Sequence, residues 1–164
     1  RWSEMAVFTP VMRTHEGNRP DTNFQYYEDE DCMGQLARLV DIYTMLAPYM
    51  KTLVKENAEK GIPVQRPLFL HHEEDKRAYA IQYEYLLGRD LLVAPVYLEA
   101  RENWDVYLPE GEWVHLWTGD PYQGGDVNVD APLGYTPAFY LRDSEYAPLF
   151  EEIRRKYGTG AVTD

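Results

Sequence analysis

Cysteine is almost absent from this sequence, since Cys32 is the only one among 164 residues. A single cysteine excludes an intrachain disulfide framework and any metal site built from several cysteines. We therefore expect a reducing compartment for this protein, namely the cytoplasm.

Positive charge is also scarce, with 16 Lys and Arg against 28 Asp and Glu and a net charge of −12. Nucleic acids and anionic membranes need clustered positive charge, so neither is expected as a partner. No apolar run approaches the roughly 18–20 residues of a membrane span. The hydrophobic share of 45% is nevertheless enough for an ordinary packed core.

The chain is short for an enzyme built on a complete (β/α)8 barrel, which usually needs about 250 residues. With 164 residues, a whole enzyme of that kind is excluded. The sequence begins with Arg1 and Trp2 rather than with Met. We therefore expect it to be a piece of a longer protein.

Helical periodicity is strongest over residues 31–54, where apolar side chains recur at spacings of three and four. Carboxylates at positions 28–31 favour the start of that helix, and Gly61 and Pro63 favour its end. Pro48 lies inside the pattern and predicts a kink or a break. Two further helices are predicted, one from Asp75 as its N-cap to residue 87 and a short amphipathic one over residues 146–153.

Short β-prone runs, separated by Gly- and Pro-rich turns, fill most of the remaining chain. Their spacing predicts a β-sandwich or a small antiparallel sheet in the second part. The final residues, 158–164, are expected to be loose. The predicted strands lie at residues 7–12, 65–70, 91–96, 104–108, 112–117, 127–130 and 138–141.

The fold class is therefore predicted as α/β followed by all-β, because the helix-rich part precedes the strand-rich part. The boundary is expected near Gly61 and Pro63. This gives three segments: residues 1–61, residues 62–145 and a C-terminal helix with its tail over residues 146–164.

The richest polar cluster is Arg13-Thr14-His15-Glu16, at the end of the first predicted strand. Arginine offers a planar fork of donors, and histidine offers both a donor and an acceptor. In an extended chain Arg13 and His15 point to the same side, as residues two apart do. The alternative is a surface loop in which Glu16 pairs with Arg13 or Arg19.

A second cluster, His71-His72-Glu73-Glu74-Asp75, superficially resembles a metal site. Adjacent histidines on a strand point to opposite faces, and the i, i+4 spacing of helical metal sites is absent. A polar turn that caps the next helix is favoured over a metal site. No motif for nucleophilic, phosphate or dinucleotide chemistry is present, and paired glycosidase carboxylates cannot be recognised by spacing.

Several stretches resemble the C-terminal part of family-31 glycoside hydrolases, in the order that this family has them. Residues 8–15 match a Phe-x-Pro-x-x-Arg-x-His pattern, and residues 61–68 match Gly-x-Pro-x-x-Arg-Pro-Leu. The loop at residues 12–20 is most similar to that of the bacterial sulfoquinovosidases of this family. The other matching stretches are residues 87–96, 107–113 and 117–119.

The resemblance implies that the chain holds the last strand and helix of a (β/α)8 barrel, followed by an antiparallel β-sandwich. The family's nucleophile and acid/base aspartates would lie upstream, so no catalytic residue is assigned in this chain. Arg13 and His15 match residues that line the subsite of the cleaved sugar. Neither a cofactor nor a metal is implied.

Three functions follow as hypotheses. The first is the C-terminal part of a retaining α-glycosidase that acts on sulfoquinovosides, its partners being a small glycoside and the upstream barrel portion. The second keeps the family but takes a neutral α-glucoside or α-xyloside as substrate. The third is a non-catalytic sugar-binding or structural module, and homo-oligomerisation stays open for all three.

Overall fold

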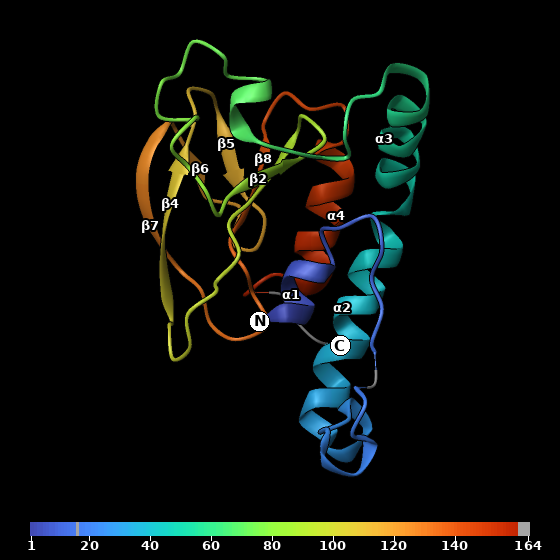
Figure 1. Cartoon of the computed structure of the whole chain (residues 1–164). Helices are drawn as coiled ribbons and strands as arrows, with labels where there is room; N and C mark the ends of the chain where they lie inside the picture. The colour runs from blue at the N-terminus through green and yellow to red at the C-terminus, as the bar shows by residue number, and fades with distance from the viewer. Residues whose placement is uncertain (16, 161–164) are drawn as a thin grey trace.

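The computed structural model describes residues 1–15 and 17–160, which form three layers (Figure 1). A six-stranded sheet lies in the middle, helices cover one face, and a two-stranded sheet covers the other. The helices are α1 Trp2–Ala6, α2 Glu30–Met45, α3 Ala47–Lys60 and α4 Ala147–Tyr157, with short 3-10 turns η1 Pro20–Thr22, η2 Tyr26–Glu28 and η3 Leu68–Leu70. The strands are β1 Gln65–Arg66, β2 Tyr85–Leu87, β3 Leu91–Val93, β4 Asn103–Leu108, β5 Trp113–His115, β6 Pro121–Tyr122, β7 Gly125–Asp130 and β8 Ala138–Leu141.

The strand order in the larger sheet is β1-β2-β3-β8-β5-β6, and every neighbouring pair is antiparallel. Strands β4 and β7 form the second sheet, also antiparallel. The predicted antiparallel β organisation of the second part is thus confirmed. Strand β8 enters between β3 and β5, so the middle of the sheet is made by a late part of the chain.

Two apolar clusters hold the layers together, one on each face of the six-stranded sheet. Leu87, Leu91 and Val93 face the helices, while Leu86 and Leu92 face the small sheet. Neighbouring residues along β2 and β3 therefore belong to different clusters, as the period-two geometry of a strand requires. Because both faces are covered, these strands are apolar throughout rather than alternating.

The long predicted helix is present as two helices, which confirms the break expected from Pro48. Helix α2 ends at Met45, and Pro48 lies in the first turn of α3, where its missing N–H is no loss. Asp29 caps the start of α2 by accepting the Cys32 N–H at 2.7 Å. Gly61 ends α3 in the left-handed conformation, with φ 72°. The predicted C-terminal helix is also present, as α4.

Two predicted elements are wrong, and the strand predicted over residues 65–70 ends at Arg66 because Pro67 has no N–H to donate and residues 68–70 form the 3-10 turn η3. Residues 75–84 form turns rather than a helix, and the chain enters β2 at Tyr85. Asp75 accepts the backbone N–H of Arg77 at 2.9 Å, so its side chain closes a turn instead of capping a helix. Residues 7–12 contain no strand, since no described strand pairs with them and Pro10 carries no N–H.

The apolar stripe of α2 and α3 folds back onto the rest of the chain. Leu39, Ile42, Leu46 and Tyr49 are buried in the same cluster as β3, β8 and α4. Side chains from both sides of residue 61 therefore share one core, and the three-segment division stays a prediction. Among residues 1–15 and 17–160, no helix has the length and apolar character needed to cross a bilayer.

Candidate functional site

The polar cluster predicted from sequence follows α1 on a segment that runs beside α2 (Figure 1). Two tyrosine hydroxyls donate hydrogen bonds to the backbone of this segment, a few residues before Arg13. Tyr43 of α2 donates to the carbonyl of Pro10 at 2.9 Å, and Tyr85 of β2 donates to the carbonyl of Phe8 at 3.0 Å. The segment leading to Arg13 is thus attached to both a helix and the sheet.

Arg13 lies on a cavity of about 520 Å³ between α1, this segment and α2. Most of the lining is apolar, and Arg13 is the charged group among the lining side chains. Its exposed guanidinium can donate up to five hydrogen bonds in a planar fork. The cavity is lined by Trp2, Ser3, Ala6, Met12, Arg13, Thr14, Tyr26, Met33, Leu36, Ala37, Val40 and Tyr43.

His15 is exposed and does not line this cavity, so the structure places only one of the two predicted residues there. It follows Arg13 by two residues in irregular backbone. Glu16, whose pairing with Arg13 or Arg19 was the alternative, lies outside the described residues.

A neighbouring cavity of about 840 Å³ shares Ser3, Thr14, Tyr26 and Leu36 with the first and is bordered by carboxylates. Glu4 is one of them, and it is 3% exposed. It accepts the Gly134 N–H at 2.7 Å and a bond from the Arg1 guanidinium at 3.0 Å. Glu4 therefore fastens α1 to the loop before β8, and both of its oxygens are engaged in structural contacts.

The remaining carboxylates of that cavity, at positions 29–31, are exposed at the start of α2. There they favour the positive end of the helix dipole, as predicted for a solvated helix start. None of these carboxylates lines the Arg13 cavity.

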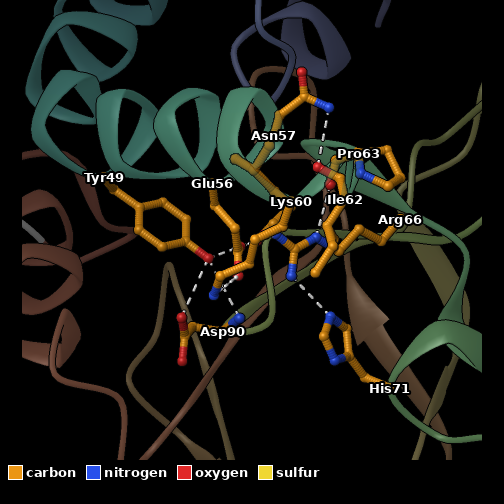
Figure 2. A network of polar contacts seen from close by, with 10 residues as sticks. Tyr49, Glu56, Asn57, Lys60, Ile62, Pro63, Arg66, His71 and Asp90 are labelled. Atoms are coloured by element: carbon orange, nitrogen blue, oxygen red, sulfur yellow. Dashed lines mark hydrogen bonds and ion pairs between the residues drawn. The ribbon is translucent and has the colours of Figure 1, made fainter.

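A second polar network, centred on Arg66, joins α3 to the sheet (Figure 2). Arg66 is 2% exposed and donates to the Pro63 carbonyl at 2.7 Å, to Glu56 and to His71. Its guanidinium lowers the pKa of Glu56, chiefly through that hydrogen bond. All three nitrogens of the guanidinium have protein partners, so this arginine stabilises the fold rather than offering a free site for a ligand.

Beside Arg66, the Tyr49 hydroxyl donates to the Leu87 carbonyl at 2.6 Å. The same hydroxyl oxygen accepts a hydrogen bond from the Asp90 N–H at 3.3 Å (Figure 2). Burial raises the pKa of the Tyr49 hydroxyl far above its ordinary value. The hydroxyl therefore stays protonated and works as a permanent donor to β2.

The two adjacent histidines are not arranged around a common ion. Among the described residues, no group of three or more His, Cys, Asp or Glu side chains is placed to hold a metal. His71 instead contacts Arg66, and the pKa values of His71 and His72 are both lowered, mainly by burial.

Sequence reasoning did not single out Tyr43 or Tyr85. Tyr43 fits the apolar face of a helix, which is typical of core packing. The hydroxyls of both tyrosines donate to main-chain carbonyls that are distant in the sequence. Arg66 belongs to the Gly-x-Pro-x-x-Arg-Pro-Leu motif, but the motif does not indicate that its side chain is buried. That burial results from the positions of Glu56, Pro63 and His71 around it.

Comparison with known proteins places these features in a family. Residues 61–144 match the model of the glycosyl hydrolase family 31 C-terminal domain. The sulfoquinovosidase of Escherichia coli (strain K12) is 52% identical over 154 residues, which cover 94% of this chain and 23% of that protein.

Solved structures show the same relationship. A family-31 sulfoquinovosidase from E. rectale, in complex with an aza-sugar inhibitor, is 71% identical with a TM-score of 0.95, covering 96% of this chain and 24% of that one. A family-31 α-xylosidase from a soil metagenome, complexed with xylose, is 28% identical with a TM-score of 0.82, covering 91% of this chain and 25% of that one. The chain spans about a quarter of the length of these relatives. By its matched domain and by its structure, this chain belongs to glycosyl hydrolase family 31.

Proposed function

We propose that this chain is the C-terminal portion of a retaining α-glycosidase that hydrolyses α-sulfoquinovosides and releases sulfoquinovose. The observation that carries the proposal is the similarity to the E. rectale sulfoquinovosidase, at 71% identity over nearly the whole chain. The 52% identity to the E. coli sulfoquinovosidase supports the same substrate class.

In this proposal residues 1–61 complete the (β/α)8 catalytic barrel, residues 62–145 form the β-sandwich that follows it, and residues 146–164 supply a terminal helix and tail. The match of the family's C-terminal domain to residues 61–144 supports the division near Gly61. The wall that α1 and α2 build around Arg13 then belongs to the sugar subsite, at the strand ends where such barrels bind ligands.

Arg13 and His15 are proposed as substrate-binding residues. The guanidinium of Arg13 can hold a sugar hydroxyl or orient the nucleophile carboxylate, and a nearby cation keeps the pKa of such a carboxylate low. His15 can donate to and accept from ring hydroxyls. The roles need no cofactor or metal.

The covalent chemistry belongs to aspartates outside this chain. In retaining hydrolysis one carboxylate attacks the anomeric carbon and the other protonates the leaving oxygen, then activates water. Without that pair no glycosyl-enzyme forms, so residues 1–164 alone are proposed to be inactive.

The second candidate is a neutral substrate, favoured by the 28% identity to the α-xylosidase. A non-catalytic sugar-binding module is less well supported. Trp113 and Trp117 are 0% and 2% exposed, so these rings pack in the core, and the exposed Tyr79, Tyr83 and Tyr97 lie outside the strands instead of on a sheet face.

The experiment compares hydrolysis of an α-sulfoquinovoside and of the matching α-glucoside by the full-length enzyme. We expect a strong preference for the sulfoquinovoside, and equal rates on both substrates would contradict the sulfonate assignment. His15→Ala should lower turnover about tenfold or more if His15 binds the transition state. His72→Ala, outside the proposed subsite, is the matched control, and unchanged kinetics in His15→Ala would remove His15 from the site.

A further inference from the structure

We propose that Tyr43 and Tyr85 are positioning residues for the sugar subsite, because their hydroxyls hold the segment that presents Arg13 and His15. The inference rests on the proposed function, and it names residues that act on the subsite through the backbone. Tyr43 comes from α2 and Tyr85 from β2, so the sheet would share control of the subsite geometry.

The first support is how the backbone of this segment finds its hydrogen bonds. Residues 7–12 are not in a strand, and two of their carbonyls accept instead from tyrosine hydroxyls. Tyr85 donates to the Phe8 carbonyl at 3.0 Å, and Tyr43 donates to the Pro10 carbonyl at 2.9 Å. Each hydroxyl satisfies a main-chain acceptor that would otherwise lose its partner.

The second support is that both tyrosines are rigidly placed. Tyr43 and Tyr85 are half-buried and pack against the cluster between the helices and the six-stranded sheet. Tyr85 pairs in register with Val93 of β3. Burial raises the pKa of the Tyr85 hydroxyl well above its ordinary value, so it donates at every working pH. Fixed donors of this kind restrict where the accepting backbone can lie.

The third support is proximity to the proposed site. Pro10 precedes Arg13 by only three residues, and Tyr43 lines the same cavity as Arg13. A shift of the Pro10 carbonyl would therefore displace the backbone close to Arg13. Misplacement of a binding group by about 1 Å can lower the rate by up to 100-fold. The position of this segment should therefore affect kcat/KM.

The test uses Tyr43→Phe and Tyr85→Phe in the full-length enzyme, since each removes one hydroxyl and keeps the ring. Tyr79→Phe is the matched control, because its hydroxyl donates to the Glu73 carbonyl at 3.1 Å on an exposed loop away from this segment. We expect kcat/KM to fall about tenfold in each of the first two variants and to stay within about twofold in the control.

Two further measurements separate positioning from general stability. Amide hydrogen exchange over residues 11–15 should become several-fold faster in Tyr43→Phe and Tyr85→Phe but not in Tyr79→Phe. In an Arg13→Ala, His15→Ala background, the same Tyr→Phe changes should lower kcat/KM less than about twofold, because the groups they position are gone.

The outcomes distinguish this inference from the proposed function. Faster exchange in an enzyme without α-glycosidase activity would show that the tyrosines hold the segment, while the proposed function fails. In an active enzyme, unchanged exchange or unchanged kinetics in both variants would overturn the inference. The inference would also be overturned if the Tyr→Phe changes lowered kcat/KM equally in the parent and in the Arg13→Ala, His15→Ala background. The tyrosines would then act on some other part of the enzyme.

Discussion

Nη1 of Arg66 lies 2.8 Å from Nε2 of His71, and this contact defines the state of the imidazole. A guanidinium can only donate, so Nε2 must accept and the ring must be neutral with its proton on Nδ1. The pKa of His71 is lowered, first by burial and then by Arg66, in agreement with that state. One buried arginine thereby sets the hydrogen bonding of α3, the chain after it and the turn at His71.

Replacing Arg66 with Met should destabilise the protein by about 2 kcal/mol, because the Pro63 carbonyl and the His71 ring lose the buried donor that satisfies them. Lys60→Met is the control, since Lys60 contacts the same Glu56 at 3.4 Å from an exposed position. That change should cost less than about 1 kcal/mol. Urea unfolding of both variants measures the difference, and equal losses would contradict the role given to Arg66.

Gly88→Ala should be much more damaging than Gly61→Ala, although both glycines have positive φ, 64° and 72°. A Cβ at Gly88 would overlap the Tyr49 hydroxyl and the Leu53 side chain, whereas one at Gly61 meets nothing within 4 Å. We expect about 1 kcal/mol for Gly61→Ala from backbone strain and at least about twice that for Gly88→Ala. Thermal unfolding of the two variants tests this order.

His115 should make the protein lose stability as the solution becomes acidic. The ring is 3% exposed, Nδ1 lies 3.0 Å from the Thr118 hydroxyl, and burial lowers the pKa of His115 to about 4. The pKa of His115 is lower in the folded state than its unfolded value of about 6.5. The neutral ring therefore makes its full contribution to the free energy of unfolding above pH 6.5, and this contribution is lost as the pH falls toward 4. His115→Gln should remove a slope of up to about 1.4 kcal/mol per pH unit in that window. Parallel stability curves for variant and parent would refute this assignment.

Glu84 should act in the opposite direction. Its carboxylate accepts the Tyr107 N–H at 2.9 Å through Oε1, while Oε2 is buried without a partner among the described residues. Burial raises the pKa of Glu84 to about 7, above the ordinary 4.5, so stability falls as pH rises between these values. Glu84→Gln should therefore gain stability relative to the parent from pH 4.5 to 7.

The control for that prediction is Glu74→Gln, at an exposed position in the preceding turn region. The free energy of unfolding of Glu74→Gln should change with pH in the same way as that of the parent protein. Denaturant titrations at pH 4.5, 5.5, 6.5 and 7.5 give the comparison, and a Glu84→Gln curve that tracks the parent would show that the carboxylate titrates normally.

Helices α2, α3 and α4 and several of the strands could be predicted because their signals are local. The break before Pro48 and the end of α3 at Gly61 each follow from neighbouring residues, and the short apolar runs of β3 and β8 indicate strands in the same local way. The helix predicted from Asp75 failed for a different reason. Tyr79 and Tyr83, placed on its apolar face by spacing, are exposed in turns, and pairing with β1 and β3 draws Tyr85–Leu87 into a strand.

The site is less predictable than the fold, because its geometry comes from distant contacts. Arg13 could be picked out by its chemistry, but nothing near it in sequence indicates that α2 supplies a cavity wall. The tyrosine bonds to Phe8 and Pro10 span 77 and 33 residues. Such contacts depend on how α2 and the sheet pack together, which no local pattern encodes.

The place of β8 in the six-stranded sheet has a consequence for how the protein is made. Without residues 138–141, the pairings of the sheet divide into two groups, β1-β2-β3 and β5-β6, and strands β3 and β5 would each lack a partner on one edge. Ala138–Leu141 then joins them by pairing with β3 and β5, and α4 follows to cover the face. Completion of the sheet therefore depends on a long-range pairing, and a chain that stops before residue 138 would leave β3 and β5 with unpaired edges that favour aggregation.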